Sequence, residues 1–424
     1  MPRPTSAARR RPAAERDWLL RCYLLRATDS LAAAVVMYAV PLLVLALTHS
    51  PGWAGTAFLL EWLPRLLAIA GAGPLIDRRS PRAAVLGTGL LRAAAALATL
   101  VGLAAGAGPW IVLGFGVVAG MLAEAAFLAN ESLGGDASRR AGERAHRVQA
   151  VLTGTDQAAL LVGPLVGGLL LLAGPALLLA AVAILSTLTA TVALTMRSGR
   201  PHLHLVSDTA ATRPLANLAT GLDVLRRTPA LAWLVGALAC VNLASGLLQV
   251  SAPITVTRTL HHSSAAVGLV WSIAAALSLA AVAAARRAID RWGLLGVGSA
   301  SAAAMCTATL ASALAPTLPL YAAAVGLLMA GEGAVTVVLR TARARLIPQR
   351  AFAATLASTV LIVLAPLPVA GLLVALWPAE HLRVLVALTA VAVSAGTWAC
   401  FRGLRTHRTA WTTATDSEPA AKAA

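Results

Sequence analysis

Long apolar stretches and short polar breaks alternate along most of this chain. Each apolar stretch is about 20 residues long, the length that an α-helix needs to cross the roughly 30 Å hydrocarbon core of a bilayer. Because backbone groups inside lipid must be paired within their own segment, we expect these stretches to be helices. The pattern predicts twelve of them, at residues 27–47, 53–76, 83–105, 109–134, 148–173, 175–196, 230–257, 264–285, 294–314, 317–339, 352–376 and 382–402.

The polar segment 197–229 is the one long internal break, and it divides the predicted helices six and six. Within it, Leu218, Leu222 and Leu225 have helical spacing, which predicts an amphipathic helix on the membrane surface. We therefore expect five regions. They are a basic N-terminal tail (1–26), a six-helix bundle (27–196), a central loop with the amphipathic helix (197–229), a second six-helix bundle (230–403) and a disordered tail (404–424).

Composition excludes an ordinary soluble domain, because 58% of the residues are hydrophobic and only 12% are charged. Soluble chains carry roughly 25% charged residues. The net charge of +17 is unevenly placed: alternate loops and both tails hold nearly all of the 34 Lys and Arg residues, whereas the opposite loops hold Arg258 and Arg383. This asymmetry predicts a multi-pass plasma-membrane protein with both termini in the cytoplasm and contacts to anionic lipid, and it argues against nucleic acid as a partner.

Short sequences recur in the two halves in the same order. Ile76-Asp77-Arg78 recurs as Ile289-Asp290-Arg291, and Met121-Leu-Ala-Glu124 has a counterpart in Met329-Ala-Gly-Glu332. Such repeats indicate an internally duplicated chain, and many transporters consist of repeated halves with the substrate path between them.

The polar break after the second predicted helix reads Gly73-Pro-Leu-Ile-Asp77-Arg78-Arg-Ser-Pro-Arg82. It resembles the signature loop of the major facilitator superfamily, G-x-L-a-D-R-x-G-R-R, although serine and proline replace its second glycine and a basic residue. The second copy retains Asp290, Arg291 and Gly293 but lacks the leading glycine. The resemblance implies two six-helix bundles and a role for both loops in gating between states. A solvated basic turn is the structural alternative.

The fifth predicted helix carries a run of small residues that resembles the superfamily's antiporter motif, G-(x8)-G-x-x-x-G-P-x-x-G-G. Its residues are Gly154, Gly163, Pro164, Gly167 and Gly168, and Ala159 replaces one glycine. This motif implies export, whereas helix packing alone is the structural alternative. Together with Phe58–Leu67, Gly221–Pro229 and Arg340–Pro348, the chain is most similar to the branch of enterobactin-type siderophore exporters and macrolide efflux proteins.

Ionisable residues inside a bilayer are costly and are candidates for function. For one set we expect charge pairing: Asp29, Glu61, Arg65, Arg92 and Glu131. Glu61 and Arg65 are four residues apart on one helix and could neutralise each other.

Glu124 and Glu332 differ from that set, because neither has a basic residue within one helical turn and they occupy corresponding positions in the two halves. A carboxyl group there could take up and release a proton near neutrality, as proton-coupled transport requires. Asp156 is a further proton-coupling candidate. A protonated, hydrogen-bonded glutamate with a structural role is the alternative.

We therefore predict an all-α major facilitator fold that exports a hydrophobic or amphipathic small molecule, such as an antibiotic or a siderophore, in exchange for protons. Facilitated uptake of a nutrient and a non-transporting sensor or scaffold are the alternatives. We expect a monomer that is not an enzyme and has no cofactor. The four cysteines are scattered and His261-His262 lacks a third ligand, so we expect no metal site.

Overall fold

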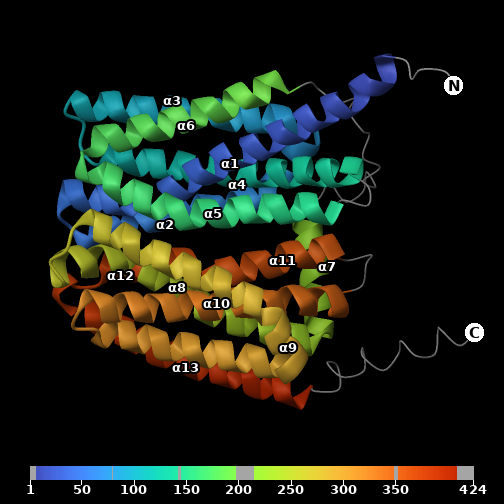
Figure 1. Cartoon of the computed structure of the whole chain (residues 1–424). Coiled ribbons are helices and arrows are strands. Elements are labelled where there is room, and N and C mark those ends of the chain that lie inside the picture. Colours follow the sequence, from blue (N-terminus) through green and yellow to red (C-terminus); the bar gives the residue numbers. More distant parts are fainter. Residues whose placement is uncertain (1–5, 79, 142–144, 197–213, 348–351, 408–424) are drawn as a thin grey trace, which may run out of the picture.

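The computed structural model describes residues 6–78, 80–141, 145–196, 214–347 and 352–407, and these contain helices and no strands. Figure 1 shows two helical bundles side by side, formed by the two halves of the chain. The N-terminal half contains α1 (Ser6–Thr48), α2 (Pro51–Arg78), α3 (Pro81–Ala104), α4 (Trp110–Ala141), α5 (Ala145–Leu172) and α6 (Pro175–Thr195). The C-terminal half contains α8 (Pro229–Ile254), η2 (Thr255–Thr259), α9 (Ser264–Leu314), α10 (Leu318–Leu346), α11 (Phe352–Leu364), α12 (Pro366–Leu376), η4 (Ala379–His381) and α13 (Leu382–Thr406).

Eleven helical segments among the described residues are long and apolar enough to cross a membrane. The predicted twelfth span corresponds to α2. Its described part carries Glu61 and Arg65, which lower the apolar content of that helix. The all-helical fold class predicted from hydropathy is therefore confirmed for the described part of the chain.

Four helix boundaries differ from the predicted ones. The helix α1 begins at Ser6, within the segment predicted as a tail, and the amphipathic helix α7 spans Pro214–Arg227. The predicted span 352–376 is two helices, α11 and α12, because Pro366 has no N–H and its ring prevents a regular helix from continuing through it. Two further predicted spans are joined in α9, where Gly293 at φ 70° forms a kink.

Many of these helices begin at a proline. Pro51, Pro81, Pro175 and Pro229 each occupy the first helical position, where a missing N–H removes no helical hydrogen bond. The junctions 48–51, 104–110, 172–175, 259–264, 314–318 and 376–382 lie at one end of the bundles, which we call the short-turn end. The first residues of α1 and the last residues of α13 lie at the opposite end, which we call the termini end (Figure 1).

The two halves contact each other through glycines near the short-turn end. A Cβ atom on Gly371 of α12 would lie 2.6 Å from the backbone nitrogen of Leu59 in α2. A Cβ atom on Gly168 of α5 would lie 2.6 Å from the carbonyl oxygen of Ser264 in α9. Real Cβ contacts are longer than this, so both helix pairs, α2 with α12 and α5 with α9, can approach this closely only with glycine at these positions.

Candidate functional site

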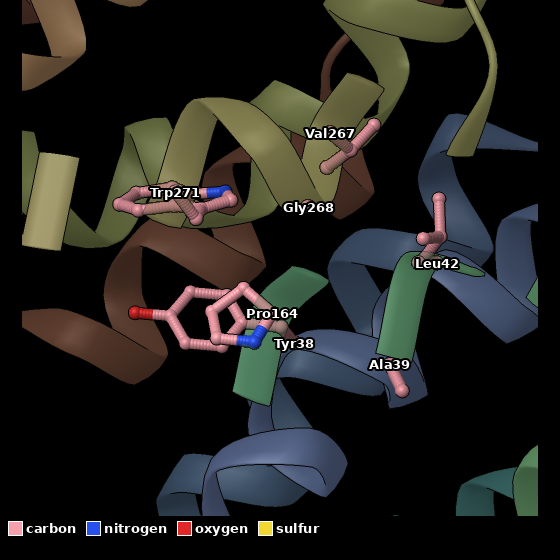
Figure 2. Close-up of a pocket in the computed structure, with 8 residues that line it drawn as sticks. Tyr38, Ala39, Leu42, Pro164, Val267, Gly268 and Trp271 are labelled. Atoms are coloured by element: carbon pink, nitrogen blue, oxygen red, sulfur yellow. The ribbon is translucent and has the colours of Figure 1, made fainter. Parts of the chain in front are cut away.

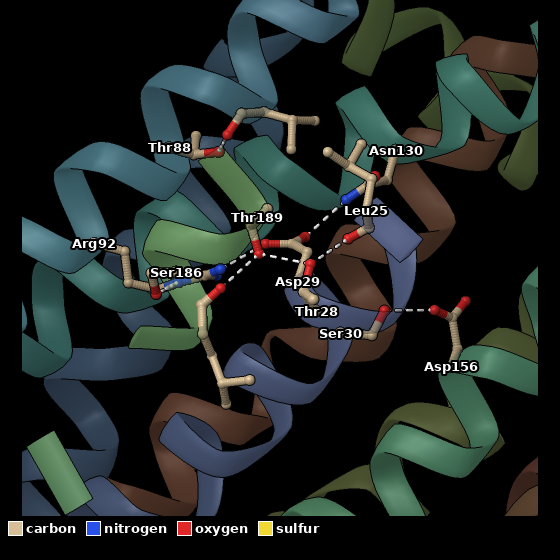
Figure 3. A network of polar contacts seen from close by, with 12 residues as sticks. Leu25, Thr28, Asp29, Ser30, Thr88, Arg92, Asn130, Asp156, Ser186 and Thr189 are labelled. Carbon is tan, nitrogen blue, oxygen red and sulfur yellow. Dashed lines mark hydrogen bonds and ion pairs between the residues drawn. The ribbon is translucent and has the colours of Figure 1, made fainter. Parts of the chain in front are cut away.

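A buried polar network holds four helices of the N-terminal half together (Figure 3). Arg92 of α3 donates from Nη2 to Asp29 Oδ1 of α1 at 2.6 Å and from Nε to Ser186 Oγ of α6 at 2.9 Å. Asn130 of α4 donates from Nδ2 to the second Asp29 oxygen at 2.7 Å. All four side chains are buried, and both Asp29 oxygens accept hydrogen bonds, so this network is suited to fixing the helices in place.

A second network lies one turn earlier on α1. Arg26 donates to the two oxygens of Asp156 in α5 at 2.7 and 2.6 Å, and to Glu131 Oε1 of α4 at 2.5 Å. Ser30 also donates to Asp156, at 2.7 Å (Figure 3). Asp156, a predicted proton-coupling candidate, therefore accepts a two-pronged hydrogen bond from a buried guanidinium.

A third group of charged residues connects α2 and α4. The Nε atom of Arg65 lies 3.2 Å from Glu124 Oε1, and its Nη1 atom lies 4.0 Å from Glu61 Oε1. Arg65 also lies over the ring of Trp62, at 4.5 Å from the centroid. The sequence shows no basic residue within one turn of Glu124 on its own helix, and in the structure α2 supplies Arg65 from outside that helix.

The C-terminal half contributes a carboxyl group in different surroundings. Glu332 of α10 accepts a hydrogen bond from Ser245 Oγ of α8 at 2.9 Å. Tyr38 of α1 interacts electrostatically with both Glu332 and Glu61, so it connects the acidic groups of the two halves. We call the polar residues Tyr38, Glu61, Arg65, Glu124 and Glu332 the central polar set.

Figure 2 shows the contact between the halves next to Tyr38. The rings of Tyr38 and Trp271, from α1 and α9, have centroids 5.2 Å apart, and Pro164 of α5 lies beside them. They enclose a cavity of about 10 Å³, room for roughly one water molecule.

The small residues of the predicted antiporter motif face different neighbours. A Cβ atom on Gly163 would lie 2.6 Å from the Ala34 Cβ atom of α1, and one on Gly167 would lie 3.6 Å from the carbonyl oxygen of Val35. Gly168 instead faces α9 of the other half, while Gly154 has no atom within 4 Å of such a Cβ. The motif, with Pro164 inside α5, therefore packs this helix against α1 on one side and against α9 on the other.

The predicted gating loops are described only in part. Gly73, Asp77 and Arg78 belong to the end of α2, but their side chains lie outside the described residues. Arg82 donates hydrogen bonds to the carbonyl oxygens of Ala193 and Leu194 at 2.7 and 2.8 Å, so it caps the end of α6 in the same half. In the second copy, Asp290 and Arg291 are exposed beside the kink at Gly293.

Sequence reasoning missed Tyr38, Ser245 and Asn130. Each is an uncharged polar residue within a predominantly apolar helix, and such residues in lipid often hydrogen-bond across helices. That signal was available, but which helix each residue faces depends on packing. No group of three His, Cys, Asp or Glu residues suited to a metal ion is present in the described ranges.

Comparison with known proteins agrees with this architecture. A family model described as Major Facilitator Superfamily matches residues 22–361. A bacterial homologue of the iron transporter ferroportin in an inward-facing state is 18% identical, with a TM-score of 0.70 over 92% of this chain and 98% of that one. The outward-facing state of a bacterial ferroportin homologue, with soaked iron, has a TM-score of 0.54 at 18% identity, over 92% of this chain and 99% of that one.

A second solved structure is similar to the same degree. A bacterial homologue of the human lysosomal transporter Spinster, inward-facing and unoccupied, is 16% identical with a TM-score of 0.70, over 94% of this chain and 98% of that one. No curated protein sequence matches the chain. At these identities the structural likeness shows a shared fold, that of multi-pass membrane transporters.

Proposed function

The chain belongs to the major facilitator superfamily, and from this membership we propose that it exports a hydrophobic or amphipathic small molecule in exchange for protons. The observation that carries the proposal is the central polar set, in which carboxyl groups of both halves lie in the helical interior with a single arginine among them. Ionisable groups are retained inside membrane helices chiefly where they bind ions, protons or substrate. Antibiotics, siderophores and related metabolites are the substrate classes to test first.

Alternating access requires that the two bundles separate at one end while they close at the other. The glycine contacts of α2 with α12 and of α5 with α9 support a state closed at the short-turn end. The higher TM-score to the inward-facing ferroportin homologue than to the outward-facing one supports the same assignment. The basic loops support a cytoplasmic termini end in the plasma membrane, with the Asp77 and Asp290 loops as the latches of the cytoplasmic side.

Export direction is supported by the position of the α5 motif. Gly168 and Pro164 lie at the contact between the halves, which must rearrange when access alternates, whereas Gly163 and Gly167 pack against α1 of the same half. Among the coupling candidates, Glu124 and Glu332 belong to the central polar set. Asp156 instead accepts two hydrogen bonds from Arg26 and does not belong to that set.

Accumulation in intact cells tests the proposal. Cells that produce the protein should retain less of an amphipathic antibiotic or siderophore than cells with an empty vector, and a protonophore should abolish the difference. A difference that survives the protonophore contradicts proton coupling. Higher retention in the producing cells contradicts export and supports facilitated uptake.

A further inference from the structure

Among the described side chains of the N-terminal half, three arginines are buried, and they differ in how firmly they are held. Arg26 and Arg92 donate hydrogen bonds to carboxylates at 2.5–2.7 Å. Arg65 lies at 3.2 and 4.0 Å from its two carboxylates, and neither contact has the geometry of a hydrogen bond. Arg65 is therefore the one of these three whose guanidinium is shared between two acidic groups without being fixed to either.

Of the two carboxyl groups beside Arg65, Glu61 has fewer contacts that would stabilise a negative charge. Its side chain is 1% exposed, and neither of its oxygens has a hydrogen-bond partner. Glu124 is closer to Arg65 and is 18% exposed. A buried carboxyl group that accepts no hydrogen bonds is stable in its neutral form, whereas one close to a guanidinium can stay ionised.

Close packing of α2 on α4 sets up this arrangement. A Cβ atom on Gly120 of α4 would lie 2.6 Å from the backbone oxygen of Glu61, so α4 approaches α2 directly at this level. One turn further along both helices, Glu124 lies beside Arg65. A small side-chain movement of Arg65 along α2 is therefore enough to exchange Glu124 for Glu61 as its nearer partner.

The charged and titratable groups around Glu61 are few. They are Arg65 on its own helix, Glu124 of α4 and Tyr38 of α1, with Glu332 of α10 beyond Tyr38. The helices α8, α11 and α12 also pack against α2 and carry no charged residue, and the two arginines of α3, Arg82 and Arg92, bond to α6 and to Asp29. Glu61 is thus surrounded by groups that can respond to its charge.

The geometry points to Glu61 as the residue that carries the exchanged proton, with Arg65 as the group that moves between Glu124 and Glu61. In the observed state Glu61 holds the proton and Arg65 pairs with Glu124. When the proton leaves Glu61 for water in the transport pathway, the new carboxylate draws Arg65 toward it and weakens the hold on Glu124. No bond other than the O–H bond of the carboxyl group is broken. This inference rests on the proposed proton exchange and assigns its carrier.

Infrared difference spectroscopy of the purified protein in lipid tests the carrier without any substrate. A change of pH should alter the C=O stretching band of protonated carboxyl groups in the wild type. Glu61→Gln should remove the largest part of that change, and Glu61→Asp should restore a band. Glu131→Gln is the matched control, because Glu131 is already paired with Arg26 and is 53% exposed. A spectrum of Glu61→Gln that equals the wild type, or loss of the band in Glu124→Gln or Glu332→Gln instead, overturns the assignment.

Inverted vesicles with an imposed proton gradient separate this assignment from the proposed function. If amphipathic compounds collapse the gradient with the wild type and equally with Glu61→Gln, export stands and Glu61 is not the carrier. If they collapse it with the wild type and not with Glu61→Gln, both stand. If no compound collapses it with the wild type, the proposed function fails, and with it the role of Glu61 in transport.

Discussion

Replacement of Gly371 by alanine should open the short-turn end of the molecule. The added Cβ atom would lie 2.6 Å from the Leu59 nitrogen and 2.9 Å from the Gly55 oxygen, and both are backbone atoms of α2. Because helix backbones cannot turn aside as a flexible side chain can, α12 and α2 must separate. Overpacking of this kind costs about 1–3 kcal/mol. The cost falls on the closed state alone, so the population that is open at this end should rise about 5- to 150-fold.

Thiol labelling measures this population. Ala54, buried at the contact of α2 with the C-terminal half, is replaced by cysteine in a variant that lacks the four native cysteines. A membrane-impermeant maleimide should label this cysteine faster, by about the same 5- to 150-fold, when Gly371→Ala is added. Gly114→Ala is the control, because a Cβ atom there meets nothing within 4 Å. Equal labelling rates with and without Gly371→Ala, or an equal rise with Gly114→Ala, would refute the reasoning.

Three further predictions concern stability and gating. Asp29→Ala leaves the Arg92 guanidinium buried without its carboxylate, so the free energy of unfolding, measured by thermal unfolding, should fall by about 3–5 kcal/mol. The double variant Asp29→Leu with Arg92→Leu should restore most of that loss. Gly293→Ala places an L-residue at φ 70° and should cost about 1–2 kcal/mol in the same assay. Arg258→Ala removes a hydrogen bond to the His49 carbonyl oxygen between the halves, so it should raise maleimide labelling several-fold; an unchanged rate would contradict this latch.

Much of the helical architecture could be predicted from the sequence, because lipid imposes helix length and apolar content directly. The boundaries that differ have local causes. Pro366 splits one span, and the non-helical backbone of Gly293, at φ 70°, kinks α9 between two of the predicted spans. The helix α1 extends through polar residues into the predicted N-terminal tail, whereas the hydropathy pattern predicted only its apolar part.

The residues of the site were largely recognisable, whereas their partners were not. The sequence identified Glu61 and Arg65 as a pair because they are four residues apart. It gave no sign that Glu124, on another helix, lies closer to Arg65 than Glu61 does, because that proximity depends on the glycine contact between α2 and α4. Pairing across helices is set by packing, which a single sequence does not reveal.

Proton movement by the purified protein tests the central claim most directly. Inverted vesicles that contain the protein and a pH-sensitive dye receive an imposed proton gradient and then a panel of amphipathic antibiotics and siderophores, with Glu124→Gln beside the wild type. The account predicts that at least one compound collapses the gradient with the wild type and that the variant, which removes the carboxylate nearest to Arg65, responds more weakly. A gradient that no compound changes, while a compound still crosses the membrane through the protein, would contradict proton-coupled export.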